Sequence, residues 1–375
     1  MRVPQFSLAS QTVRIKEELG EAIKQVINKG SFILGENVRR FEEKVADYLG
    51  AAHAVGVGNG SDALFLALQS CGIGPGDEVI TTPFTFFATA GSIVRAGAVP
   101  VFVDIDPKTF NLDAGRLESE ITEKTRAIMP VHLYGQAADM GPVMDAANKY
   151  KLKVIEDTAQ AMGSTYNGQM TCSFGDAGCL SFFPTKNLGG FGDGGMVVTN
   201  NLEVVENLKM LRVHGSRIKY YHEVVGINSR LDELQAAILV VKMKYLNEWI
   251  TARKNAAGIY SELIKQSGLG DIVKEPYAIK EGFHTYNQYT VRVPLRDELQ
   301  AYLKECGIGT AIYYPLPLHL QPSFSSLGYK PGDFPESEKA CGEVISLPVF
   351  PEITLEQQVC VIDTIKTFYE GKGLF

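Results

Sequence analysis

Short apolar, strand-like runs alternate with helix-periodic segments through the first two thirds of the chain. Asp62 to Gln69 has the spacing of a helix, with Ser61 as its expected N-cap. A strand that is followed by a helix pairs with the next strand through a crossover, so this alternation predicts βαβ units and a mostly parallel sheet covered on both faces. The runs that we assign to strands are 78–82, 99–103, 127–131, 152–155, 179–183 and 196–199.

The pattern changes near Leu231. The apolar spacing predicts one long helix over 232–251, and a strand at 288–293, a helix at 296–305 and a strand at 310–314 follow. A chain of 375 residues is long enough for two domains. We therefore expect an α/β fold with a large domain over 1–249 and a smaller C-terminal α/β domain over 250–375.

Charge and composition exclude several classes of protein. The chain has 36 Lys and Arg against 43 Asp and Glu, a net charge of −7, so it lacks the basic excess of a nucleic-acid binder. It contains no run of 18 apolar residues that could span a membrane, and residues 1–20 lack the apolar core of a secretory signal. Its six cysteines are scattered without a C-x-x-C pair. We expect a cytoplasmic protein with reduced thiols, no metal site, and no nucleic-acid or membrane partner.

The segment 181–195, SFFPTKNLGGFGDGG, contains one lysine between an apolar strand and five glycines. A surface lysine beside a flexible turn is the alternative interpretation, but the neighbouring Phe182 and Phe183 are costly in solvent. A P-loop is excluded because that motif places its glycines before the lysine. An apolar setting lowers the pKa of an amine, which is what Schiff-base chemistry requires, so Lys186 is the candidate catalytic residue.

The segment 154–163, VIEDTAQAMG, ends a predicted strand with Glu156 and Asp157. Ligands of open α/β sheets bind at the carboxyl ends of strands, and an acid there can keep a pyridine nitrogen protonated. A surface carboxylate or a helix cap would look the same. Together with Lys186 in the same sheet, Asp157 favours the functional interpretation.

Two further turns complete the pattern. VGNGSDA at 57–63 places Gly58, Gly60 and Ser61 at a helix N-terminus, where free N–H groups and the helix dipole can hold an anion. PFTFFA at 83–88 ends a strand with aromatic residues, of which Phe86 or Phe87 could stack on a flat ring. A plain capped helix and core aromatics are the alternatives.

These motifs resemble those of the DegT/StrS-type nucleotide-sugar aminotransferases, which have the aspartate-aminotransferase-like fold. The resemblance runs from GSFILG at 30–35 to the Tyr-Pro at 314–315 and HLQP at 319–322. Its most specific motifs are EDTAQAMG at 156–163, SFFPTKNLGGFGDGG at 181–195 and NSRLDELQAAIL at 228–239. The resemblance implies pyridoxal 5'-phosphate as the cofactor, with pyridoxamine phosphate in the other half-reaction.

The resemblance also assigns roles to individual residues. Lys186 would form the internal aldimine and then shuttle protons, and Asp157 would pair with the pyridine nitrogen. The other implied cofactor contacts are Gln160 on the phenolic oxygen, Phe86 and Ala159 on the two ring faces, and Gly60, Ser61 and Ser181 on the phosphate. Asn228 would reach the phosphate in the partner subunit's site, which implies a homodimer with shared active sites.

Two segments are expected to bind the sugar nucleotide. HGSRIKYYH at 214–222 could be a solvated loop, but its basic and aromatic residues could also meet a diphosphate. The candidate substrate-binding residues are Arg217, Lys219, Tyr220, Tyr313, Tyr314 and His319. Many relatives have His where this chain has Tyr313, and the set resembles members that aminate C3 of the sugar.

The implied reaction is a ping-pong transamination from L-glutamate to a keto group, at C3, of a nucleotide-linked sugar. Amination at C4 or of a keto-cyclitol remains the alternative. Sugar dehydration is disfavoured because dehydrating relatives have histidine in place of Lys186. A dinucleotide enzyme is disfavoured because GNGSDA has Ala63 where a third glycine belongs and no suitably placed ribose acid follows. A regulatory or scaffold protein would not need the Lys186–Asp157 pair.

Overall fold

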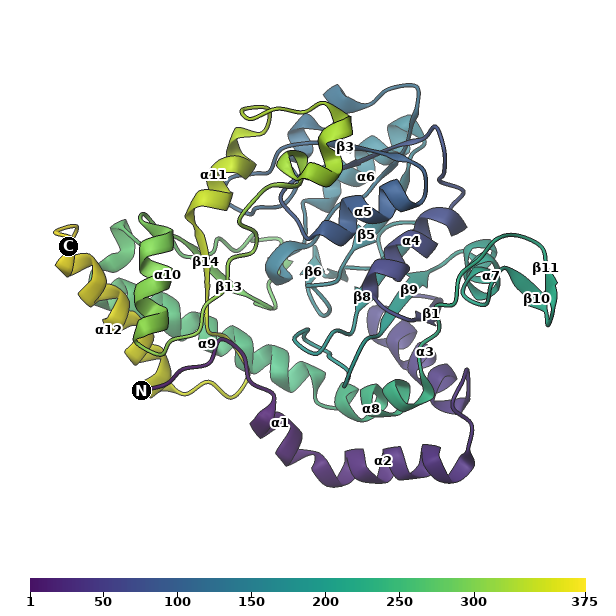
Figure 1. Cartoon of the computed structure of the whole chain (residues 1–375), viewed down its shortest axis with the longest axis horizontal. Coiled ribbons are helices and arrows are strands. Elements are labelled where there is room, and N and C mark those ends of the chain that lie inside the picture. The colour runs from purple at the N-terminus through teal and green to yellow at the C-terminus, as the bar shows by residue number, and fades with distance from the viewer.

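The computed structural model describes residues 1–375, and a seven-stranded sheet forms its centre (Figure 1). The strands lie in the order β1-β9-β8-β5-β4-β2-β3, and only β9 runs antiparallel to its neighbours. The mostly parallel α/β sheet predicted from the alternation is therefore confirmed. The strands are β1 His53–Val57, β2 Glu78–Thr81, β3 Val99–Phe102, β4 Thr125–Ile128, β5 Lys153–Asp157, β8 Ala177–Ser181 and β9 Gly195–Thr199.

Helices cover both faces of this sheet, as the alternation of side chains along its strands requires. Cys179 and Val197 pack with α4, α5 and α7 on one face, whereas their neighbours Leu180 and Met196 pack with α3 and α8 on the other. Helix α6 covers the second face beyond β5. The helices are α3 Glu36–Leu49, α4 Gly60–Ser70, α5 Phe87–Arg95, α6 Met140–Tyr150, α7 Leu202–Leu211 and α8 Glu233–Met243.

The expectation of a single helix over 232–251 is wrong. Helix α8 ends at Met243, and α9 begins at Leu246 and runs to Ser267. The last turn of α8 tightens, since Lys244 and Tyr245 donate to the carbonyls three residues back, and Trp249 then starts a new set of bonds to Tyr245.

The smaller C-terminal part surrounds α9 and holds both chain termini (Figure 1). Its core joins α9 to the two-stranded sheet of β13 and β14, and Val3 from the N-terminus belongs to the same cluster. The predicted domain boundary between residues 249 and 250 falls inside α9. The division of the chain into two domains at this point stays a prediction. The elements of this part are α10 Arg296–Glu305, α12 Leu355–Gly371, β13 Tyr289–Arg292 and β14 Val344–Leu347.

The expected strand at 310–314 is absent. Only Ala311 pairs, in an isolated bridge to Ser346, and Tyr313 and Tyr314 turn away to pack on a cluster that includes Phe84. Prolines at 315 and 317 stop a regular ladder here because they have no N–H to donate. The chain then returns to the large part through η4 Leu318–Leu320, η5 Pro322–Leu327 and α11 Pro335–Glu343.

Short elements complete the fold. A hairpin, β10 Ser216–Ile218 and β11 Tyr221–His222, projects beyond α7 at the right of Figure 1. No helix is both long and apolar enough to cross a membrane. The remaining elements are α1 Ala9–Arg14, α2 Lys16–Lys29, η1 Ala114–Glu120, η2 Leu133–Gly135, η3 Leu269–Asp271, β6 Thr165–Tyr166, β7 Gln169–Met170 and β12 Gly282–Phe283.

Candidate active site

Lys186 follows β8 in a turn that is held by its own backbone. Its N–H donates to the carbonyl of Phe183, and the fully buried Phe182 anchors the start of the turn in the core. The lysine side chain is half-buried, and burial lowers its pKa to about 8, an effect that the nearby Asp157 carboxylate partly opposes. An amine with this lowered pKa has a much larger neutral, nucleophilic fraction near neutral pH than an ordinary lysine.

Asp157 ends β5 in a buried position, with 5 % of the residue exposed, and its carboxylate is near enough to Lys186 to act on the pKa of the amine. Burial raises its pKa, whereas the Thr89 hydroxyl, the Ala159 N–H and the Lys186 ammonium oppose that rise. Thr89 Oγ1 donates to Oδ2 at 2.7 Å, and the N–H of Ala159 donates to Oδ1 at 3.2 Å. The carboxylate therefore has a fixed direction and retains accepting capacity for a ligand.

Gln160 is held in one orientation. Its Oε1 accepts from the N–H of Tyr134 at 2.8 Å, so its Nε2 must point the other way, where it donates to the Tyr314 hydroxyl at 3.0 Å. The Phe86 ring is 56 % exposed and lies 6.0 Å from the Tyr314 ring, centroid to centroid. A flat ring placed between these groups would meet an amide donor at its edge and an aromatic face.

A cradle for an anion lies at the N-terminus of α4. Asn59, not Ser61 as expected, is the N-cap: its Oδ1 accepts from the N–H of Asp62 at 2.8 Å. The N–H groups of Gly60 and Ser61 then lie in the first turn without helical acceptors. A Cβ at position 60 would come within 2.7 Å of Ser181 Cβ, so β8 meets the cradle at a distance that only glycine allows.

Asn228 lies at the surface, while its neighbour Ser229 passes close to the same cradle. Ser229 is buried, and its hydroxyl accepts from the N–H of Gly58 at 2.9 Å. The exposed side chain of Asn228 is thus free to meet another chain, and its role there stays a prediction.

The predicted substrate-binding residues fall into two groups. Arg217, Lys219 and Tyr220 lie on the exposed hairpin, where Arg217 pairs with Glu223. Tyr313 and Tyr314 lie beside the site. His319 does not: its side chain has no exposed surface, and its Nε2 pairs with Glu338 Oε1 at 3.1 Å.

The structure adds residues that the motifs did not reveal. Thr89 orients Asp157, and Tyr134 orients Gln160. Thr89 was visible in the sequence as the third residue after Phe86, but an aromatic pattern gives no reason to select it.

The residues present fit pyridoxal phosphate. The anion cradle, the amine of Lys186 and the carboxylate of Asp157 lie at the ends of strands on one sheet, in agreement with the rule for ligands of open α/β sheets. Each of the three matches one chemical group of this cofactor: phosphate, aldehyde and pyridine nitrogen.

Comparison with known proteins agrees with this geometry. Residues 13–366 match the model of the DegT/DnrJ/EryC1/StrS aminotransferase family. A "Pleiotropic regulatory protein" of Geobacillus stearothermophilus is 55 % identical over 98 % of this chain and 99 % of its own. The UDP-2-acetamido-2-deoxy-3-oxo-D-glucuronate aminotransferase of Pseudomonas aeruginosa is 43 % identical over 92 % of this chain and 94 % of its own.

Solved structures lead to the same family. The structure of S. venezuelae DesV in complex with a ketimine intermediate superposes with a TM-score of 0.94, at 39 % identity, and covers 98 % of this chain and 99 % of DesV. Sequence, architecture and site chemistry therefore agree, and the chain belongs to the DegT/DnrJ/EryC1/StrS aminotransferase family, as an enzyme that uses pyridoxal phosphate.

Proposed function

We propose that this enzyme transfers an amino group from L-glutamate to C3 of a keto sugar that is linked to a nucleotide, for amino-sugar biosynthesis. The observation that carries the proposal is the half-buried Lys186 amine, which is electrostatically coupled to the buried Asp157 carboxylate on the sheet edge that holds the Gly60–Ser181 cradle. The 3-oxo sugar in the name of the Pseudomonas relative supports the position. We further propose a cytoplasmic homodimer.

Lys186, Asp157 and Gln160 have separate roles in the proposed reaction. When bound, the cofactor supplies an electron sink for the carbon that exchanges its amine. Lys186 Nζ takes and returns the proton at that carbon, for which a pKa of about 8 suits it. Asp157 would hold the ring nitrogen in its protonated form, and Gln160 Nε2, which donates to the Tyr314 hydroxyl here, would bond the phenolic oxygen.

Other residues would bind and orient the partners of the reaction. Gly60, Ser61 and Ser181 form the phosphate cradle, and Phe86 and Ala159 would enclose the ring. Asn228 and the exposed hairpin at 216–222 would act in the partner subunit's site, where Arg217 and Lys219 can meet a diphosphate. Tyr313 and Tyr314 would contact the sugar. A role for His319 there would require its ring to leave Glu338.

Purified enzyme tests this proposal directly. We expect a yellow protein that L-glutamate bleaches, and a Lys186→Ala variant that folds but does not turn over. Full activity in the Lys186→Ala variant would contradict the catalytic role of Lys186. A wild-type protein that stays colourless with added pyridoxal phosphate would contradict the proposed cofactor chemistry.

The acceptor is identified separately. The glutamate-treated enzyme is offered 3-keto and 4-keto sugars on UDP and dTDP, together with a keto-cyclitol. Return of the yellow colour with a 4-keto sugar or the cyclitol alone would favour the alternative. The regulatory interpretation predicts no colour change with any of them, and the presence of both Lys186 and Asp157 argues against it.

A further inference from the structure

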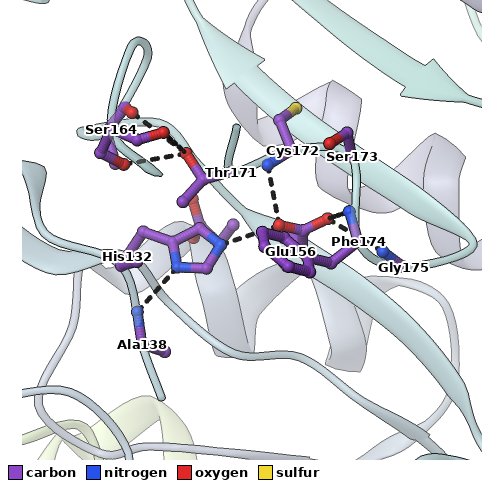
Figure 2. A network of polar contacts seen from close by, with 12 residues as sticks. His132, Ala138, Glu156, Ser164, Thr171, Cys172, Ser173, Phe174 and Gly175 are labelled. Carbon is purple, nitrogen blue, oxygen red and sulfur yellow. Dashed lines mark hydrogen bonds and ion pairs between the residues drawn. The ribbon is translucent and has the colours of Figure 1, made fainter. Parts of the chain in front are cut away.

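A buried carboxylate–imidazole pair (Figure 2) includes the residue that comes directly before Asp157 in the chain. Glu156, the preceding residue of β5, and His132 are both completely buried. His132 Nε2 lies 3.0 Å from Glu156 Oε2. The other three donors to this carboxylate are backbone N–H groups of one turn, at 2.7, 2.8 and 3.0 Å: those of Cys172, Phe174 and Gly175.

The imidazole has no nitrogen left for another partner. The N–H of Ala138 donates to Nδ1 at 2.9 Å, so this nitrogen carries no proton and Nε2 is the one that donates to Glu156. With both nitrogens engaged and no exposed surface, His132 is not placed to act on a substrate. It instead connects Glu156 to the segment 130–138.

That segment runs along one side of the residues proposed to hold the cofactor. The N–H of Asp157 donates to the Pro130 carbonyl at 2.9 Å, and the N–H of His132 donates to the Asp157 carbonyl at 3.0 Å. Two residues later, the N–H of Tyr134 fixes the amide of Gln160. The position of segment 130–138 therefore sets both Asp157 and Gln160.

The turn 171–175 runs along the other side. Thr171 donates its N–H to the Ser164 carbonyl at 3.0 Å, and the two hydroxyls lie 2.9 Å apart. This contact ties the turn to the chain that follows Gln160. Glu156 thus joins both flanking segments through a single carboxylate, as Figure 2 shows.

We propose that Glu156 and His132 are positioning residues that hold Asp157 and Gln160 in place for the cofactor without touching it. This inference rests on the proposed roles of Asp157 and Gln160. A carboxylate suits the position because an apolar side chain would leave three backbone N–H groups and an imidazole N–H buried without acceptors.

Glu156→Gln is the informative variant. Both oxygens of Glu156 accept from N–H donors, so either orientation of the new amide sets its NH2 against at least one donor. Losing hydrogen bonds to a charged group corresponds to about 10- to 100-fold. We expect the dissociation constant of pyridoxal phosphate to rise and kcat to fall by that factor, while the KM for L-glutamate changes less than about twofold.

Two substitutions of His132 separate the effect of its hydrogen bond to Glu156 from the effect of its size. His132→Gln keeps a donor for Glu156 and should stay close to the wild type in cofactor affinity, whereas His132→Leu should resemble Glu156→Gln. These two variants carry the test if Glu156→Gln does not fold, as judged by circular dichroism. Equal cofactor affinity in His132→Gln and His132→Leu would contradict the proposal.

Asp104 offers a matched control at the sheet edge, three strands away from β5. It is buried, and its carboxylate also accepts from four donors: the N–H groups of Ile105, Glu336 and Ser337, and the Ser337 hydroxyl. Asp104→Asn should lower the melting temperature without changing the affinity for pyridoxal phosphate. A Glu156→Gln variant that behaves in the same way would be only structural, and the proposal would fall.

A double-mutant comparison shows whether Glu156 acts through Asp157. In an Asp157→Asn background, the factor by which Glu156→Gln raises the cofactor dissociation constant should shrink, because one of the two contacts that Glu156 positions is already lost. An undiminished factor would refute the coupling. If Asp157→Asn alone left cofactor affinity and turnover intact, the proposed role of Asp157 would itself be wrong, which is a separate result.

Discussion

The hydrogen bond from Thr89 to Asp157 gives a prediction whose size depends on pH. Thr89 is completely buried, and its hydroxyl donates to Asp157 Oδ2 at 2.7 Å. Thr89→Val keeps the shape of the side chain and removes this donor, and it also takes away the partner of the Thr85 hydroxyl, a loss between neutral groups that does not depend on pH. A hydrogen bond to a charged group contributes about 1.5–3 kcal/mol, and one between neutral groups about 0.5–1.5 kcal/mol. The cost of the substitution therefore depends on whether Asp157 is charged.

The sign follows from the pKa of Asp157. Burial raises that pKa in the folded protein above its unfolded value of about 4, so the favourable contribution of the protonated form is lost as the pH rises through the folded pKa. Removing the Thr89 donor raises the pKa further, since Thr89 opposes the effect of burial. Thr89→Val should thus cost about 1 kcal/mol at pH 4 and about 2–3 kcal/mol at pH 8.

Urea unfolding of the apoprotein, at one protein concentration and at several pH values, measures this difference. Thr85→Val is the control, because the Thr85 hydroxyl contacts only that of Thr89, at 3.0 Å, and no charged group. Its cost should stay near 1 kcal/mol at every pH. A Thr89→Val penalty that does not grow with pH, or that equals the penalty of Thr85→Val throughout, would refute the reasoning.

Three further predictions concern the same region. Lys186→Met should stabilise the apoprotein below pH 8, and this advantage should shrink between pH 8 and about 10.4. Over that range the unfolded lysine is still protonated while the folded one is not, so the wild type gains stability as the pH rises. Urea unfolding of both proteins at pH 7 and pH 10 measures the difference in their free energies of unfolding. Gly195→Ala would place a Cβ 2.3 Å from the Asn59 carbonyl oxygen, so it should lower the free energy of unfolding by about 1–3 kcal/mol and weaken binding of pyridoxal phosphate. Gly74→Ala is the control, because its Cβ would have its nearest atom at 3.8 Å, and it should have neither effect. Thermal shifts with and without the cofactor measure both variants. Asn187→Ala removes bonds from Nδ2 to the Met162 carbonyl at 3.2 Å and to the Thr285 hydroxyl at 3.0 Å, and should cost about 1–2 kcal/mol in unfolding and slow turnover; an unchanged kcat would show that these bonds do not hold the neighbouring Lys186.

The sequence predicted the sheet because its signal is local. Alternating strands and helices left few possible topologies, and the strand ends at Asp157 and Ser181 then placed the candidate chemistry on one edge. Errors arose where several residues could serve one purpose. In GNGSD, Asn59, Ser61 and Asp62 are all possible caps, and only the extended backbone at Asn59 decides between them.

The contacts that orient the site were not predictable by the same route. Thr89 reaches Asp157 across 68 positions, and Gln160 reaches Tyr314 across 154. Hydrophobic periodicity determines which face of an element is buried, but it does not specify which polar group of one element meets that of another. Glu156 illustrates the difference: its place at a strand end was plain, yet its four donors come from two loops whose positions only the folded chain defines. A residue within a motif can therefore determine how that motif works while carrying none of its chemistry.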